Sequence, residues 1–302
     1  MTASTRRAFL GSVAATAVAA TSRGAETQPA PSGGAAQATA KVPFVVNHDL
    51  HTHTVYSDGA HPIPLHILEA RAFELEAIAI TDHYTPGSKL ATEAEFDRYL
   101  AEIERERSGQ TDVIVLRGAE AAALDTTGRI SIDQRHAARL DWVLCDLGGF
   151  SEGTLRNPPA DKQQYVENVI RTYLGLCDVP YLNAIAHPFN TGNSRTVALP
   201  ADYPSRLLQE LAAKMAARGK VFDVMNDMIY WFHRAPIAPR ELTAQYVEVV
   251  KLFAAAGVMF QVSSDDHRTG LGNTRWSQLV LARAGVPLKQ VVDPRQIARR
   301  AG

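Results

Sequence analysis

Two histidines, His51 and His53, follow an apolar stretch of the chain and are separated by one residue. Alternate side chains of a strand project from the same face, so two imidazoles at this spacing would lie a few ångströms apart. Such a pair can bind one divalent cation, with Zn–N bonds of about 2.0–2.1 Å. A polar turn after the pair brings Asp58 back toward the same strand end. Because an isolated pair of this kind more often lines an ordinary polar surface, the metal hypothesis needs support from elsewhere in the chain.

That support comes from a pattern that repeats along the chain: a short apolar run, a polar cluster, then a helical segment. The clusters include TDH at 81–83, RGAE at 117–120, HPFN at 187–190 and SSDDH at 263–267. Histidines placed without a common function would not recur at the same end of successive strands. Their recurrence there favours a metal site. Its candidate catalytic and metal-binding residues are His51, His53, Asp58, His83, Glu120, His187, Asp265 and His267.

The segments between the clusters predict a parallel α/β fold. Parallel strands are joined by crossover helices and are buried on both faces, which makes their sequences continuously apolar. Working groups then lie at the carboxyl ends of the strands of a closed barrel. The predicted strands are 44–50, 77–80, 113–116, 142–145, 182–186, 221–225 and 258–262. The predicted helices are 62–75, 91–107, 161–176, 204–218, 240–256, 273–284 and 294–300, with a small hairpin at 121–132.

The composition and the net charge indicate which kinds of partner the protein can bind. The chain has 302 residues, is 46% hydrophobic and 21% charged, and carries a formal charge of −1. These values are typical of a globular protein, and the charge provides no basic field for a nucleic-acid polymer or anionic lipid. Local charge or a metal must therefore hold any anionic substrate. Cys145 and Cys177 stand in apolar surroundings and are expected to be buried thiols, although a disulfide stays open in an oxidising compartment.

The first forty residues differ from the rest. The segment 5–11, TRRAFLG, resembles a twin-arginine export signal, and the Ala-rich run after it at 12–20 is too short to span a bilayer. Sequence rich in Ser, Gly, Ala, Pro and Gln continues to Ala40 and is typical of a flexible linker. We therefore predict a signal and linker at 1–40 and one domain at 41–302. The twin-arginine machinery would be a partner, the location would be the bacterial periplasm, and no membrane span would remain after cleavage. A disordered cytoplasmic tail is the alternative.

The motifs HDLHTHTVYSDG at 48–59, ITDH at 80–83, RGAE, AIAHPFN at 184–190 and SSDDH occur in an order and spacing that resemble the PHP family, named for polymerase and histidinol phosphatase. The resemblance runs from about Val45 to Thr269. It implies a distorted (β/α)7 barrel that holds two or three divalent ions at its strand ends. It also implies hydrolysis of a small phosphorylated substrate. A ligand set that mixes imidazole and carboxylate favours Zn, Mn or Fe over Ca or Mg.

Carried over position by position, the resemblance implies three ion sites. The first is formed by His51, His53, Glu120 and Asp265; the second by Asp58, His83 and His267; the third by Glu120, His187 and one more histidine. At the position of that last histidine this chain has Gly148, so the third site is in doubt. Asp146 or a water is a possible substitute.

The implied reaction is in-line attack on a phosphoester by a metal-activated hydroxide. Residues that would bind the substrate are weakly indicated: Arg195, Arg268 and His233, the last beside an aromatic run at 230–232. Each has an ordinary alternative as a solvated or packed side chain. Asp49 and Asp82 are candidates to orient ligand histidines, and Asp266 is expected to serve a turn.

Two other functions stay open. One is a hydrolase of the amidohydrolase kind, which also begins with an HxH pair, but the TDH cluster and Glu120 speak against it. The other is an exported metal-binding or ligand-binding protein without catalysis, which Gly148 favours. A phosphoester panel together with metal analysis separates the three.

Overall fold

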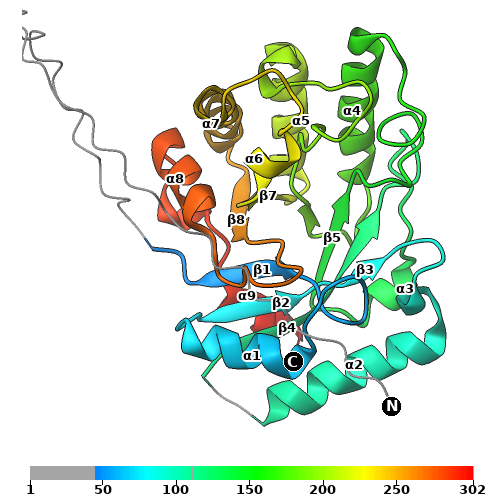
Figure 1. The fold of residues 1–302 in the computed structure, drawn as a ribbon, viewed down its shortest axis with the longest axis vertical. Coiled ribbons are helices and arrows are strands. Elements are labelled where there is room, and N and C mark those ends of the chain that lie inside the picture. The colour runs from blue at the N-terminus through cyan, green and yellow to red at the C-terminus, as the bar shows by residue number, and fades with distance from the viewer. Residues whose placement is uncertain (1–44, 110–111, 302) are drawn as a thin grey trace, which may run out of the picture. The chain divides into compact units, whose positions relative to one another are not determined.

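The structure is a computed structural model that describes residues 45–109 and 112–301, so the predicted export signal and linker lie outside the described residues (Figure 1). Its centre is a parallel sheet in which neighbouring strands follow the order of the chain. These strands are β1 (His48–Thr52), β2 (Ala77–Ile80), β4 (Ile114–Ala122), β5 (Trp142–Asp146), β6 (Ala184–Ile185), β7 (Val221–Met225) and β8 (Met259–Ser263). A two-residue strand, β3 (His83–Tyr84), pairs with β4. Apart from β3, which follows β2 after two residues, each strand is joined to the next by a crossover.

The last strand returns to the first. Thr52 forms a parallel bridge with Asp266. The Asp265 amide donates to the His51 carbonyl over 3.1 Å, and the His53 amide donates to the Asp266 carbonyl over 2.8 Å. These contacts give a nearly closed parallel barrel, which confirms the predicted fold class. They also bring the start and the end of the domain together at the strand ends.

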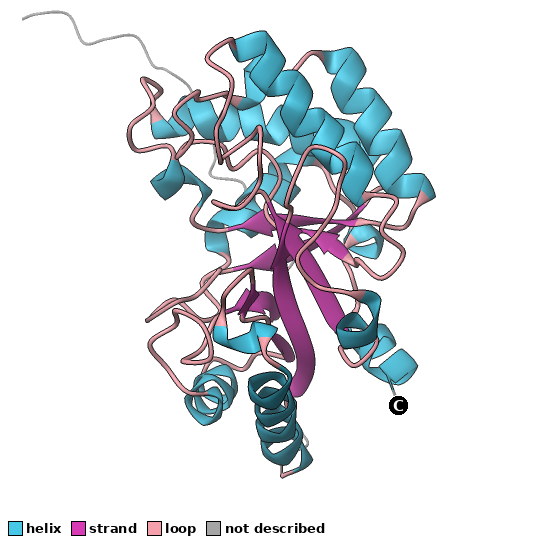
Figure 2. Ribbon diagram, turned by 90° about the vertical axis from the view of Figure 1, so that its right-hand side faces the viewer, coloured by secondary structure: helices cyan, strands magenta, loops and turns pink. Residues whose placement is uncertain are grey.

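Helices surround the strands, and Figure 1 shows α1 and α2 on one side with α4, α5 and α7 on the other. Their bounds are α1 (Ile63–Ala72), α2 (Glu93–Ser108), α3 (Gln134–Ala137), α4 (Lys162–Leu176), α5 (Ser205–Ala217), α6 (Met228–Trp231), α7 (Pro239–Ala255), α8 (Arg275–Ala284) and α9 (Pro294–Ala301). The Asp161 side chain caps α4 by accepting from the Gln164 amide over 2.7 Å. Figure 2 shows the strands grouped between these helices. None of the helices in the described part of the chain is long and apolar enough to cross a membrane.

The core has two parts because the strands are buried on both faces. Along β2, Ala77 and Ala79 belong to a smaller apolar cluster, while Ile78 and Ile80 belong to the larger one. The smaller cluster collects one face of several strands, and Ile297 of α9 packs against it. In β2 the small residues thus share one face and the large ones the other, as expected where one face points into a tight barrel interior and the other meets helices.

Most predicted elements are confirmed, with shifts at their ends. The strand predicted at 113–116 is wrong in length, because β4 continues to Ala122. Its polar residues find buried partners: the Arg117 guanidinium binds Asp141 at 2.6 Å. The short elements β3, α3 and α6 were not predicted. The hairpin is confirmed by an antiparallel bridge between Ala123 and Ile130, and both cysteines are buried and free.

Candidate metal centre

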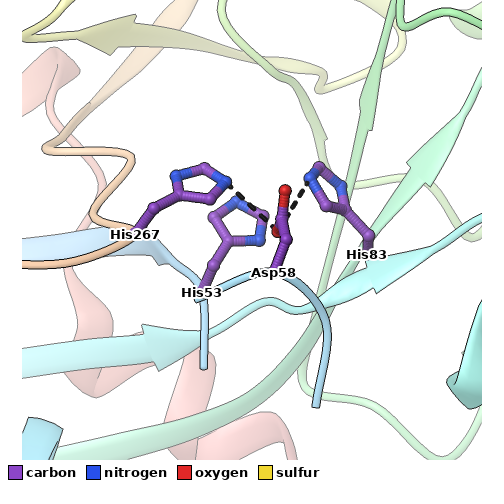
Figure 3. A group of neighbouring side chains, drawn as sticks. All are labelled: His53, Asp58, His83 and His267. Carbon is purple, nitrogen blue, oxygen red and sulfur yellow. Dashed lines mark ion pairs between the residues drawn. The ribbon is translucent and has the colours of Figure 1, made fainter. Parts of the chain in front are cut away.

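The eight candidate residues converge at the carboxyl ends of the strands. In one group, ligand atoms of His53, Asp58, His83 and His267 all lie within 4.8 Å of one another (Figure 3). A second group within the same limit contains His51, His53 and Glu120. His53 belongs to both groups, whereas the sequence comparison had assigned it to one. Without the shared His53, the second group consists of His51 and Glu120, which we call the inner pair. The first group without His53 consists of Asp58, His83 and His267, which we call the outer trio.

The remaining two candidates join these groups. Asp265 Oδ1 lies 3.1 Å from His53 Nε2 and 3.6 Å from His51 Nε2. His187 Nε2 lies 3.1 Å from Glu120 Oε1. Glu120 Oε2 is also 2.8 Å from His83 Nδ1. Glu120 therefore connects the inner pair, the outer trio and His187.

The turn that carries Asp58 is clamped to the end of β1. The Asp82 carboxylate accepts from the Thr54 amide (2.8 Å), the Thr54 hydroxyl (2.7 Å) and the Ser57 hydroxyl (2.6 Å). A Cβ at Gly59 would lie only 2.2 Å from the His53 carbonyl oxygen, so the turn approaches β1 more closely than another residue permits. Asp82 thus shapes the turn: its carboxylate binds Thr54 and Ser57, whereas the sequence predicts that it orients a ligand histidine.

Backbone strain occurs at two of the candidate ligands and at one residue beside them. His187, Phe189 and Asp265 have φ values of 67°, 71° and 57°, in the left-handed region. Such conformations cost about 1–3 kcal/mol each and persist where the surroundings hold them. The Phe189 amide donates to the Tyr173 hydroxyl over 2.8 Å, and the Tyr246 hydroxyl donates to the Pro188 carbonyl over 3.3 Å. Two buried tyrosines therefore hold the loop that presents His187.

The buried donor atoms fit a cation. His51 Nε2, both ring nitrogens of His53, and Glu120 Oε1 are buried and have no hydrogen-bond partner of acceptable geometry among the described residues. Leaving such an atom unpaired costs about 1–3 kcal/mol. The Nε2 atoms of His51 and His53 converge with the carboxylate oxygens of Glu120 and Asp265. Lone pairs that meet in this way repel one another unless a proton or a metal ion lies between them. Mixed nitrogen and oxygen donors suit Zn, Mn or Fe, so the residues present fit divalent ions.

The electrostatics favour positive charge at this place. Burial opposes protonation of His83, but Glu120 outweighs it and raises the pKa of His83 to about 10. Burial likewise opposes protonation of His187, and the Glu120 carboxylate, 3.1 Å from its Nε2, raises the pKa of His187 to about 9. For Glu120, burial favours the neutral acid, yet His51 and His83 hold its pKa well below the usual range. Metal ions would supply the same positive charge while displacing the histidine protons.

An aspartate that the sequence analysis missed supports His51 from within the barrel. Asp223 Oδ2 lies 3.2 Å from His51 Nδ1. Asp223 Oδ1 accepts from Gln261 Nε2 (3.0 Å) and from the Ser263 hydroxyl (2.8 Å), and Trp142 Nε1 donates to Gln261 Oε1 (3.0 Å). A carboxylate on one ring nitrogen fixes the tautomer and leaves the other nitrogen free as a ligand. The available signal was a charged residue inside the apolar run VFDVM.

The neighbourhood of Gly148 is occupied by a carboxylate. A Cβ built at Gly148 would lie 2.5 Å from Asp146 Oδ2. Burial, and then Glu120, raise the pKa of Asp146 to about 7. Asp146 belongs to neither of the two groups described above, but its side chain fills the space that a side chain at position 148 would need.

Asp49 and Asp266 serve the backbone. Asp49 accepts from the amides of Ser264 (2.9 Å) and Gly272 (2.8 Å). Asp266 accepts from those of Arg268 (3.0 Å) and Gly270 (2.6 Å), which agrees with its predicted turn role. Together they hold the loop that carries Asp265 and His267.

Two cavities adjoin the centre. The first, here called the aromatic cavity, has a volume of about 330 Å³ and is lined by Leu147, Phe150, Leu155, Tyr173 and Trp231, and by Asp58, His83, Glu120, Asp265 and His267. The second, the polar cavity, has a volume of about 730 Å³. Of the three substrate candidates, Arg268 lines the polar cavity, while Arg195 and His233 line neither; all three are exposed. The position of Arg195 and His233 therefore gives no support to a role in substrate binding.

Comparison with known proteins agrees with this geometry. Residues 49–256 match the family described as PHP domain. A probable phosphatase of Caldicellulosiruptor bescii is 26% identical over 254 residues, which cover 81% of this chain and 90% of that protein. A probable phosphatase of Acetivibrio thermocellus is 34% identical over 148 residues, 49% of this chain and 55% of that protein. The crystal structure of a histidinol phosphate phosphatase from Lactococcus lactis, complexed with zinc, L-histidinol and phosphate, has a similar fold, with a TM-score of 0.58 and 18% identity over 85% of this chain and 94% of that one.

Proposed function

We propose that this chain, which belongs to the PHP domain family, is a metal-dependent phosphoesterase acting on a small phosphorylated substrate. The observation that carries the proposal is the convergence of unpaired buried nitrogens of His51 and His53 with Glu120. Relatives described as probable phosphatases support the reaction class.

The residues of the centre would have different roles in metal binding and substrate binding. Bound divalent ions would supply the Lewis acidity that activates water and offsets phosphoryl charge. His51, oriented by Asp223, and Glu120 would hold the deep side of the centre. Asp58, His83 and His267 line the aromatic cavity, so a phosphate would enter over the outer trio. The apolar walls of this cavity would exclude bulk water around the reacting ester.

Two ions, one per group, are the minimum that this arrangement supports. A third ion would draw on Glu120, His187 and Asp146, with the Asp146 carboxylate in place of a side chain at position 148. Metal analysis of the purified protein tests the number: Asp146→Asn should lower the content by one ion if a third site exists. Two ions in both proteins would limit the centre to two, and three ions in both would mean that Asp146 is not a ligand of the third.

Turnover of p-nitrophenyl phosphate tests the function itself. We expect activity that a chelator abolishes and Mn or Zn restores. His51→Ala and Asp265→Ala should lose both metal and activity, whereas His61→Ala, a histidine outside the cluster, should keep both. Metal-replete protein that hydrolyses no monoester or diester would contradict the proposal.

We propose in addition that the protein is exported to the periplasm through the twin-arginine route. The support is the segment 5–11 with Arg6 and Arg7. A fusion of residues 1–40 to a reporter that is active only after export should be exported, and replacing both arginines by lysine should block it. Export of the doubly substituted fusion would refute this route.

A further inference from the structure

The lining of the aromatic cavity combines an apolar wall with carboxylates that are not matched by lysine or arginine side chains among the described residues. Its side chains include Leu147, Phe150, Leu155, Tyr173 and Trp231 on one part, and Asn190 and Asn193 as neutral polar groups. No lysine or arginine is among its lining residues within the described part of the chain. Four carboxylates line it: Asp58, Glu120, Asp146 and Asp265. The cavity therefore offers an aromatic surface and no cationic side chain other than its histidines.

This balance leaves no positive charge for a second anion. With two divalent ions bound, the carboxylates of Asp58, Glu120 and Asp265 and a phosphate dianion together exceed the charge of the ions; with a third ion, the added carboxylate of Asp146 makes the negative and positive charges equal. Asp146 adds one more carboxylate at the wall of the same cavity. A further anionic group on the substrate would then face carboxylates at low dielectric, where like charges repel strongly.

Backbone packing fixes the segment that carries Trp231 against the loop after β6. A Cβ at Gly192 would lie 2.3 Å from the Trp231 carbonyl oxygen, so the loop after β6 packs directly against the segment that carries Trp231. The neighbouring Phe232 is buried in the core. Asn190, from the same loop, has a buried Oδ1 without a hydrogen-bond partner and lines the cavity. The wall thus presents a held indole and an amide that can bind a polar group of a ligand.

We infer that the aromatic cavity receives the alcohol part of a phosphate monoester that has an aromatic or apolar group and no anionic group besides the reacting phosphate. The charge balance of the aromatic cavity disfavours a second phosphate or a carboxylate on the part of the substrate that enters it. The inference rests on the proposed phosphoesterase function and adds its substrate class. A cavity of about 330 Å³ has the size of a small-ligand site.

A matched pair of esters tests the charge balance: 4-carbamoylphenyl phosphate and 4-carboxyphenyl phosphate, which differ in charge and little in size. We expect kcat/KM for the carboxylate ester to be at least about tenfold lower. Equal efficiency on both esters would overturn the substrate class while leaving the phosphoesterase intact. Hydrolysis of neither these nor any other phosphoester would overturn the function itself.

A charge added to the wall should shift this preference. Asn193 is an exposed lining residue, so Asn193→Lys adds a cation without disturbing the core. The ratio of carboxylate to carbamoyl ester efficiency should rise about fivefold or more, and Asn193→Gln should leave the ratio unchanged. A ratio unchanged by Asn193→Lys, in a variant that still hydrolyses the carbamoyl ester, would contradict the inference. If that variant hydrolyses neither ester, the comparison of the two esters with the wild-type protein decides whether the inference holds.

The aromatic contact has its own test. Trp231→Ala should lower kcat/KM for 2-naphthyl phosphate by about tenfold, mainly through KM, and should leave methyl phosphate nearly unaffected. Trp231→Phe should recover much of the loss. Phe73→Ala, an exposed aromatic residue remote in sequence from the cavity lining, is the matched control. An equal loss on both esters would assign Trp231 to folding and refute the proposed contact.

Discussion

The inner pair and the outer trio use similar side chains in different surroundings. His51 and Glu120 lie on strands β1 and β4 with side chains 0% and 1% exposed. Asp58, His83 and His267 lie on a turn, a two-residue strand and a loop, and are 62%, 28% and 30% exposed. Strand pairing positions the first set, and hydrogen bonds within turns position the second. The comparison shows that one half of the centre is enclosed by the barrel while the half facing the cavity stays accessible to a substrate.

The two halves also differ in how they are supported. Asp223, deep in the barrel, contacts His51 Nδ1 and is itself bound by Gln261 and Ser263. The outer trio is supported by Asp82 and Asp266, which bind the backbone of its loops. A change in the inner half therefore disturbs buried charge, while a change in the outer half is partly screened by solvent.

The largest effect is expected at Glu120, which connects both halves. Glu120→Gln keeps the shape but removes the charge that faces His51, His83 and His187. We expect kcat/KM to fall by at least about 10³-fold, together with loss of most bound metal. Steady-state kinetics and metal analysis measure both. A kcat/KM within tenfold of the wild-type value would contradict the view that Glu120 connects the inner and outer halves of the centre.

Asp58→Asn should act mainly on the outer half. Its carboxylate lies 3.5 Å from His83 Nε2 and 3.4 Å from His267 Nε2. The expected loss is about 10²-fold in kcat/KM with one ion lost, and added Mn should restore part of the activity. Metal titration followed by kinetics checks this. Loss of all bound metal would instead show that the two groups bind their ions as one unit.

Asp223→Asn should have a smaller effect, because the substituted residue contacts a ligand and no substrate. We expect metal affinity to fall by about 10- to 100-fold, with KM nearly unchanged once metal is saturating. Competition with a fluorescent chelator measures the affinity. Ser263→Ala, which removes a partner of the same carboxylate, should show a weaker effect in the same direction. Normal affinity in Asp223→Asn would mean that the barrel interior does not support the inner half.

Arg195→Ala should have the smallest effect, since Arg195 is exposed and lines neither cavity. A surface substitution of this kind is expected to change stability by about 0.5 kcal/mol or less and kcat/KM by less than about twofold. The assay is the same esterase measurement. A loss of tenfold would place the phosphate farther from the outer trio than this geometry implies.

Much of the fold was predictable because its signals are local and repeated. An apolar run such as 221–225 reads as a buried strand, and β7 has those bounds. Gly219 and Gly257 end helices with φ values of 63° and 85°, as their positions in the sequence indicate. The length of β4 was missed because Arg117 and Glu120 break its apolar pattern. Their buried partners lie elsewhere in the chain.

By itself, the sequence determined that the polar clusters follow strands, and parallel strands that close into a barrel must bring those clusters to one end. Which atoms meet there was decided by the tertiary structure. Only closure between β1 and β8 places Asp265 beside His51 and His53, and only packing across the barrel places Asp223 against His51. The same holds for Trp231 at the cavity wall beside Asp58 and Glu120. A residue's type and strand position are local properties, whereas the direction of its side chain toward a partner more than a hundred residues away depends on the register and twist of every strand between them.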